Sequence, residues 1–126
     1  MRKHGKKLIW LSIALVCIGI LVINWISIER TYRAQEELVN FFGEIKMGHT
    51  RKELETLFRE SNYKYLRMHH PMENESLVRT PLQWGATNWL LWIEFVDRRV
   101  AAAMIRYQDN KHQHPDKAPP DKKVSR

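Results

Sequence analysis

Residues 8–28 read LIWLSIALVCIGILVINWISI, a run of 21 positions without a charged side chain. As an α-helix this run is about 31 Å long, enough to cross a hydrocarbon core about 30 Å thick. Trp10 and Trp25 lie near its two ends, where amphipathic rings favour the headgroup region. The sequence therefore predicts a single transmembrane helix over 8–28, with Trp10 and Trp25 at the membrane interfaces and the lipid bilayer as a partner.

Two other kinds of N-terminal segment begin in the same way, and both stay open as alternatives. A cleaved secretory leader has a shorter apolar region, closed by a small-x-small site. Here the run is longer and ends on NWISI, with no such triplet. A lipoprotein signal needs a small residue before its cysteine, whereas Val16 precedes Cys17. We therefore favour an uncleaved span.

The distribution of charge predicts the orientation of the span. Residues 1–7 form a basic segment that carries four of the seven net positive charges of the chain. The positive-inside rule places this segment in the cytoplasm and the C-terminal domain outside, which in a bacterium means the outer side of the cytoplasmic (inner) membrane. Residues 29–107 are almost neutral, so they lack the concentrated basic surface that nucleic-acid binding requires.

The remaining chain divides into one small domain, 29–107, and a tail, 108–126. The single cysteine, Cys17, lies in the span, so no intramolecular disulfide can stabilise the domain. A domain of this size has room for one core and no large catalytic cleft. The tail is polar, contains prolines and has one large apolar residue, Val124. We predict that it is disordered.

Helical patterns come first in the domain. Residues 29–42 are rich in Glu and Gln and free of Gly and Pro, so a helix is expected there, continuing the span outward. Thr50 stands three residues before Glu53 in a capping-box pattern, which predicts the start of a second helix that ends near Glu60. Its apolar stripe is Leu54, Leu57 and Phe58.

Strand patterns follow the helices. Strands are expected over 63–68, 77–80, 88–96 and 100–107, with a Pro-containing loop over 69–75. The third is the strongest, and its alternation places Trp89 and Trp92 on opposite faces, so that only one of them can lie under the helices. The sequence predicts an α+β domain of two helices packed on a three- or four-stranded antiparallel sheet.

The string IKMGHT at 45–50, with the Glu53-Leu54-x-x-Leu57-Phe58 helix and the later hairpin, resembles the SmpA/OmlA (BamE-like) family of small envelope lipoproteins. That resemblance implies two helices on a three-stranded antiparallel sheet and a role in outer-membrane protein assembly. The segments WGATNW at 84–89, WIEF at 92–95 and APPDK at 118–122 are similar to those of a group of bacterial membrane-anchored proteins. This second resemblance implies no particular activity.

No pattern in the chain predicts catalysis, a metal site or a cofactor. The histidine pairs at 69–70 and 112/114 lack a cysteine or an ordered carboxylate to complete a zinc set, so we interpret them as solvated. Gly-rich phosphate loops, paired carboxylates on one strand face and Ser/His/Asp arrangements are also missing from the pattern. We therefore expect a non-catalytic protein with no cofactor.

Aromatic residues near the third strand give the candidate partner-binding residues Trp84, Trp92 and Glu94. Tryptophan is favoured in binding hot spots, and an open sheet face that carries an aromatic ring is a recognisable docking surface. Alternatively, the outward-facing tryptophan packs beneath the segment 77–84, and Glu94 is either a buried acid or pairs with Arg106 on the solvent face of the sheet. We expect a membrane-anchored interaction module that binds an envelope or membrane protein. A tethered ligand-sensing or hydrolytic domain and a homo-oligomeric structural subunit remain alternatives, and the oligomeric state stays open.

Overall fold

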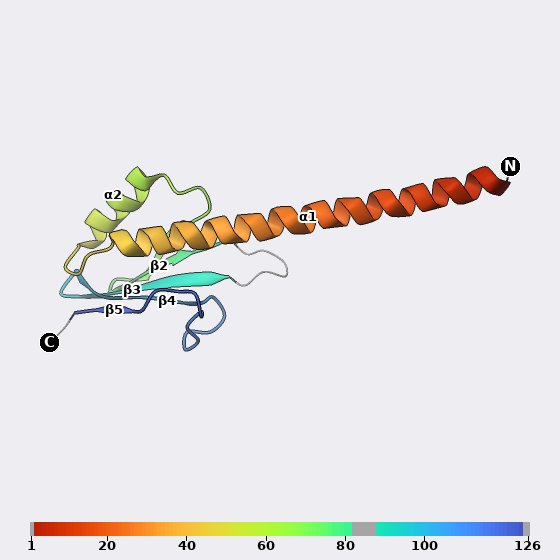
Figure 1. Ribbon diagram of the computed structural model, residues 1–126. Coiled ribbons are helices and arrows are strands. Elements are labelled where there is room, and N and C mark those ends of the chain that lie inside the picture. Colours follow the sequence, from red (N-terminus) through yellow and green to blue (C-terminus); the bar gives the residue numbers. More distant parts are fainter. Residues whose placement is uncertain (1, 82–87, 125–126) are drawn as a thin grey trace.

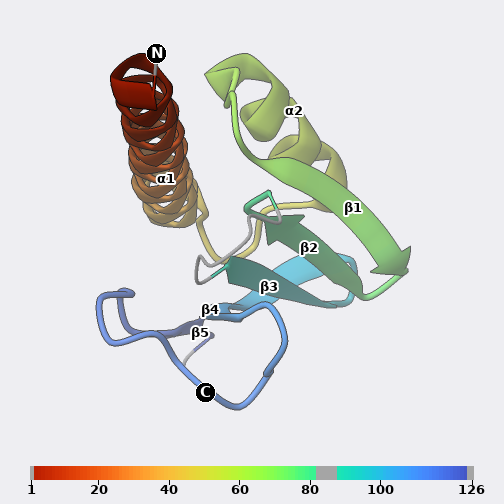
Figure 2. The ribbon, with the colours of Figure 1, turned by 90° about the vertical axis from the view of Figure 1, so that its right-hand side faces the viewer.

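A computed structural model describes residues 2–81 and 88–124 of the chain. Both helices lie over the same face of a single antiparallel sheet, whose strand order is β1-β2-β3-β4-β5 (Figure 1, Figure 2). The predicted α+β class is confirmed, with five strands in place of three or four. The elements are α1 (Arg2–Glu44), α2 (Arg51–Ser61), β1 (Arg67–Met72), β2 (Glu75–Arg79), β3 (Trp89–Val96), β4 (Arg99–Tyr107) and β5 (Lys122–Lys123).

The first helix, α1, is continuous over 43 residues, and its two parts differ in how far their side chains are buried. Its N-terminal part extends beyond the domain (Figure 1), and the apolar side chains there are exposed, with Trp10 at 71% and Trp25 at 67%. This part is long and apolar enough to cross a membrane. Its C-terminal part is one wall of the domain core, through Ala34, Leu38, Phe41 and Phe42. The C-terminal part of α1, from Ala34 onward, therefore belongs to the folded domain.

The second helix begins as its capping pattern predicts. Thr50 is the N-cap of α2, and its hydroxyl accepts a hydrogen bond from the Glu53 amide at 3.2 Å. The same hydroxyl donates to the Glu53 carboxylate at 3.2 Å. The helix ends at Asn62, whose left-handed backbone directs its amide to the Arg59 carbonyl.

The core lies between the helices and the sheet. Phe41 of α1 meets Phe58 of α2 and Tyr63 edge-on, with ring centroids 5.4 and 5.8 Å away. Glu37 of α1 accepts hydrogen bonds from the amides of Lys64 and Tyr65. The sheet contributes apolar residues from alternate positions: Val78, Trp89, Leu91, Ile93, Phe95, Val100, Ala103 and Ile105.

The start of the sheet differs from the prediction. The expected strand over 63–68 and the loop over 69–75 are wrong, because β1 runs from Arg67 to Met72 and β2 begins at Glu75. Tyr63 packs against the two helices and is not part of a ladder. Pro71 is accommodated because β1 is an edge strand whose register shifts between His69 and Met72.

The tail also differs from the prediction. Residues 108–124 were expected to be disordered, but they fold along the edge of the sheet and supply β5, which pairs with Ala102 and Ala103 of β4. Pro115 in this segment is fully buried. The contacts that fix the segment are largely polar, which explains why an absence of large apolar residues is a misleading guide here.

Candidate binding face of the sheet

The face of the sheet turned away from the helices carries the predicted partner-binding residues. We call it the outer face. Because paired residues share a face, the strand registers define its members. Trp89 lies in the core and Trp92 on the outer face, as the alternation in the third strand predicts. The outer face comprises Glu75, Leu77, Arg79, Leu90, Trp92, Glu94, Ala102, Met104 and Arg106.

Trp92 is half-buried beneath the chain that follows β4. The ammonium group of Lys111 lies 4.9 Å from the ring centroid of Trp92, a cation–π contact. Its indole N–H is buried, and the residues that the structure describes offer it no hydrogen-bond acceptor. A donor left unpaired in this way is costly, because it has lost its hydrogen bond to water and gains none from the described residues.

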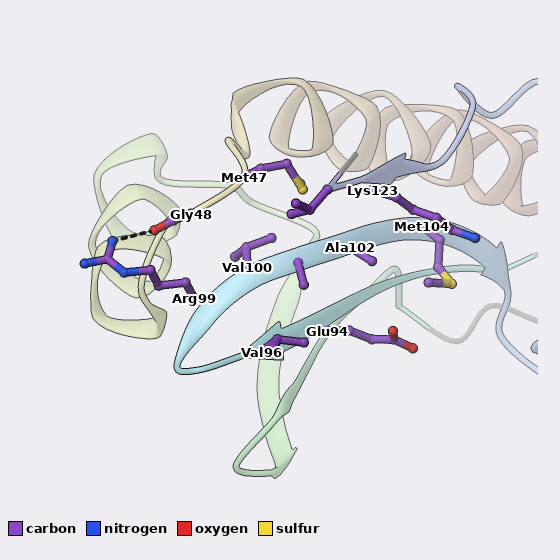
Figure 3. Close-up of a pocket in the computed structure, with 11 residues that line it drawn as sticks. Met47, Gly48, Glu94, Val96, Arg99, Val100, Ala102, Met104 and Lys123 are labelled. Carbon is purple, nitrogen blue, oxygen red and sulfur yellow. Dashed lines mark hydrogen bonds between the residues drawn. The ribbon is translucent and has the colours of Figure 1, made fainter. Parts of the chain in front are cut away.

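Glu94 lines an open hollow of about 750 Å³ at the end of the outer face near the β3–β4 hairpin. Figure 3 shows its carboxylate on the same side of the sheet as Met104 and Lys123. At the other end of the hollow, Arg99 donates a hydrogen bond to the Gly48 carbonyl at 3.0 Å. Gly48 has a φ of +93°, a conformation that favours glycine at this turn. The hollow therefore has an apolar floor and charged groups at its margin.

Arg106 does not pair with Glu94, the alternative that the sequence left open. Its guanidinium instead makes two hydrogen bonds to the Asp121 carboxylate, at 2.8 and 2.7 Å. These bonds lower the pKa of Asp121 from its ordinary value, against the opposing effect of desolvation. This pair ties the tail to the outer face and leaves Glu94 open toward the hollow.

Lys122 ties the same segment to the end of α1. Its ammonium donates to the carbonyls of Phe42 at 2.8 Å and Ile45 at 3.1 Å, and it lies 4.8 Å from the Phe42 ring centroid. A cation is favourable at a helix C-terminus because the terminal carbonyls are unpaired and carry partial negative charge. Nothing in the sequence around Lys122 predicts this long-range contact.

The structure thus brings Trp92 and Glu94 onto one face of β3, two residues apart. The third predicted residue, Trp84, lies outside the described residues. Trp10 and Trp25 are exposed on α1.

A Ser–His–Glu arrangement that the sequence did not suggest lies on the opposite side of the sheet. His70 of β1 contacts Ser76 through Nδ1 at 2.6 Å and Glu55 of α2 through Nε2 at 2.7 Å. The connectivity resembles that of a hydrolase triad. Ser76, however, is fully buried, so no substrate can reach its hydroxyl. We interpret the arrangement as a structural link that satisfies a buried polar group and ties β1 to α2.

Within residues 2–81 and 88–124, no three His, Cys, Asp or Glu side chains come together to form a metal site. Comparison of the chain with protein-family models, curated proteins and solved structures gives no match.

Proposed function

We propose that this chain is a single-pass protein of the bacterial cytoplasmic membrane that displays a non-catalytic interaction domain outside the cytoplasm. The observation that carries the proposal is the continuity of α1. The helix that has the length and composition of a span also provides buried core residues such as Leu38 and Phe41. Its basic N-terminal segment favours a cytoplasmic N-terminus.

A continuous helix fixes the height of the domain above the membrane. Glu29–Glu44 adds about 24 Å of helix beyond the predicted span at 1.5 Å per residue. Ala34, only six residues beyond Ile28, is already buried. A flexible linker would let the domain sample a large volume, whereas this arrangement holds the outer face close to the bilayer and to partners in it. Confinement of this kind raises the effective concentration of a membrane partner.

We infer that the partner is a protein and that it binds the outer face around Trp92 and Glu94. A half-buried tryptophan two residues from Glu94, which lines an open hollow, has the character of a binding hot spot. The resemblance to SmpA/OmlA proteins favours an envelope partner. A catalytic role is less well supported, because the serine of the Ser–His–Glu arrangement is buried.

Photocrosslinking in living bacteria tests this function. A photoreactive residue at position 94 of the full-length chain is expected to give a discrete adduct, and the same probe at Lys52, exposed on α2, is the matched control. The substitution Trp92→Ala should reduce the adduct roughly thirtyfold, as expected for loss of a hot-spot tryptophan. Because Trp92 lies outside the core cluster, resistance to protease should be retained.

An adduct of equal strength from positions 94 and 52 would contradict binding through the outer face. Loss of protease resistance in the Trp92→Ala chain would instead assign Trp92 a structural role and move the binding surface elsewhere. An adduct at twice the mass of the chain would identify the partner as a second copy.

A further inference from the structure

Four residues on neighbouring strands lie side by side across the outer face and form a row. In the strand registers, Ala102 of β4 pairs with Lys123 of β5 on one side and with Glu94 of β3 on the other. Glu94 in turn pairs with Glu75 of β2. The order across four strands is therefore Lys123, Ala102, Glu94, Glu75. Lys123 and Glu94 are two strands apart, a separation of about 10 Å.

Within residues 2–81 and 88–124, the two carboxylates of this row form no ion pair. Glu75 and Glu94 are directly opposite each other on neighbouring strands, an arrangement of like charges that is destabilising. Among the residues that the structure describes, neither carboxylate has a basic group within 4.0 Å. Lys123 has no acidic group within that distance, and its charge contributes to the lowered pKa of Asp121, whose carboxylate is paired with Arg106. A cation close to Glu94 would reduce the repulsion between the two carboxylates, and an anion close to Lys123 would neutralise the charge of its ammonium group.

Exposed apolar side chains surround the row. Outside α1, the large apolar residues exposed in the described chain are Met72, Val96 and Val124, and the last two line the hollow, with exposures of 50% and 48%. Met104 also lines the hollow and has an adaptable side chain. Ala102, at the centre, lines the hollow with 7% of its surface exposed, and it is small enough to permit close approach of another backbone. This surface therefore has exposed apolar side chains, with the positive charge of Lys123 on one side of Ala102 and the negative charge of Glu94 on the other.

We propose that the hollow binds a second copy of this chain, related to the first by a twofold axis that runs along the strands past Ala102. Such an axis reverses the order of the row, so that Glu94 of each copy faces Lys123 of the other. A twofold interface of this kind is self-complementary. The proposal rests on the membrane anchoring proposed above, and it names the partner of the outer face.

The direction of the axis is compatible with anchoring in one membrane. Figure 1 shows β3 and β4 running broadly along α1, so an axis along these strands also lies along the span. Two copies related in this way have both spans in the same orientation. The hollow lies beside Met47 and Gly48, just past the end of α1 that is remote from the span. The copies therefore meet at the ends of their domains farthest from the bilayer.

The contact is small and is expected to depend on the membrane. Lys111 lies over the ring of half-buried Trp92 and partly covers the outer face next to the hollow, so the area available to a second copy is small. Interfaces well below about 1,200 Å² are weak between freely diffusing proteins. Confinement of two anchored copies to one bilayer raises their effective concentration and compensates for the small area.

Disulfide cross-linking of the full-length chain in bacterial membranes tests the dimer. In a Cys17→Ser background, Ala102→Cys is expected to give a cross-linked dimer on mild oxidation, and Lys52→Cys on α2 is the matched control that should stay monomeric. In the Ala102→Cys chain, either Glu94→Lys or Lys123→Glu alone should reduce the dimer roughly tenfold, because two facing pairs become repulsive. Co-expression of these two variants with different tags should restore a mixed dimer, since both facing pairs are then attractive.

Equal cross-linking from positions 102 and 52, or failure of the mixed pair to recover, would overturn the dimer. As a second readout that leaves Ala102 intact, differently tagged chains carrying only the charge changes are compared by energy transfer in the same membranes. If the chains stay in the membrane but never pair, the dimer proposal fails and the anchoring stands. If the chains leave the membrane, the anchoring itself fails.

Discussion

Replacing Phe41 by alanine is expected to lower the free energy of unfolding of the domain by about 3–5 kcal/mol, the range for truncation of a buried phenylalanine. Phe41 has no exposed surface and contacts the rings of Phe58 and Tyr63. A domain of this size has a total stability of only about 5–15 kcal/mol. The Phe41→Ala domain should therefore unfold at a much lower urea concentration than the parent domain. Near-ultraviolet circular dichroism of the full chain in detergent micelles measures this difference.

The matched control lies on the same helix. Leu21 is exposed on α1, and Leu21→Ala should leave the stability of the domain within about 0.5 kcal/mol of the parent, as for other exposed positions. Similar effects of the two substitutions would contradict the division of α1 into an exposed anchor and a buried wall of the core.

The second large effect is expected at the Arg106–Asp121 ion pair, which holds residues 108–124 against the sheet. Asp121→Asn should lower the free energy of unfolding by about 1–3 kcal/mol, because it removes the charge from two hydrogen bonds and leaves the Arg106 guanidinium without a carboxylate. Hydrogen exchange followed by mass spectrometry should show loss of protection in residues 108–124. Unchanged protection would mean that Lys122 and the buried Pro115 suffice to hold the segment.

The same pair predicts a pH dependence. The pKa of Asp121 is lower in the folded protein than its ordinary value near 4, because Arg106 hydrogen-bonds its charged form. The unfolded chain therefore takes up this proton first as the pH falls. The stabilisation is complete above about pH 5 and is lost as the pH falls below 4. The difference in stability between the parent and Asp121→Asn should shrink over that range, and a constant difference would contradict the assignment.

The parts of the fold that could be predicted from sequence are those determined by local patterns. The capping pattern at Thr50 places the start of α2, and the alternation in β3 separates Trp89 from Trp92. Each pattern reports on neighbours within a few residues. The apolar run of α1 likewise needs no tertiary information to be recognised.

The parts that could not be predicted depend on contacts distant in sequence. β1 contains Pro71 and has mostly exposed side chains, so nothing local distinguishes it from a loop, and its position follows from pairing with β2. Lys122 reaches carbonyls of α1 about 80 positions earlier in the chain. The Ser76–His70–Glu55 arrangement depends on the correct placement of β1.

The candidate site shows the same division. Trp92 and Glu94 could be singled out because an aromatic strand with an acidic residue is visible in the sequence. Lys123 could not, because its position in line with Ala102 and Glu94 depends on the pairing of β5 with β4. The polar composition of the tail predicts disorder, so no local pattern assigns its lysines to a binding face.

The mass of the chain that remains in bacterial membranes after alkaline extraction tests whether α1 is a permanent anchor continuous with the domain. We expect an intact chain of 15.1 kDa in the membrane pellet. A shorter chain that lacks the apolar run and is recovered in the soluble fraction would show that the run is a cleaved leader. That result would contradict both the fixed height of the domain and its confinement to the membrane.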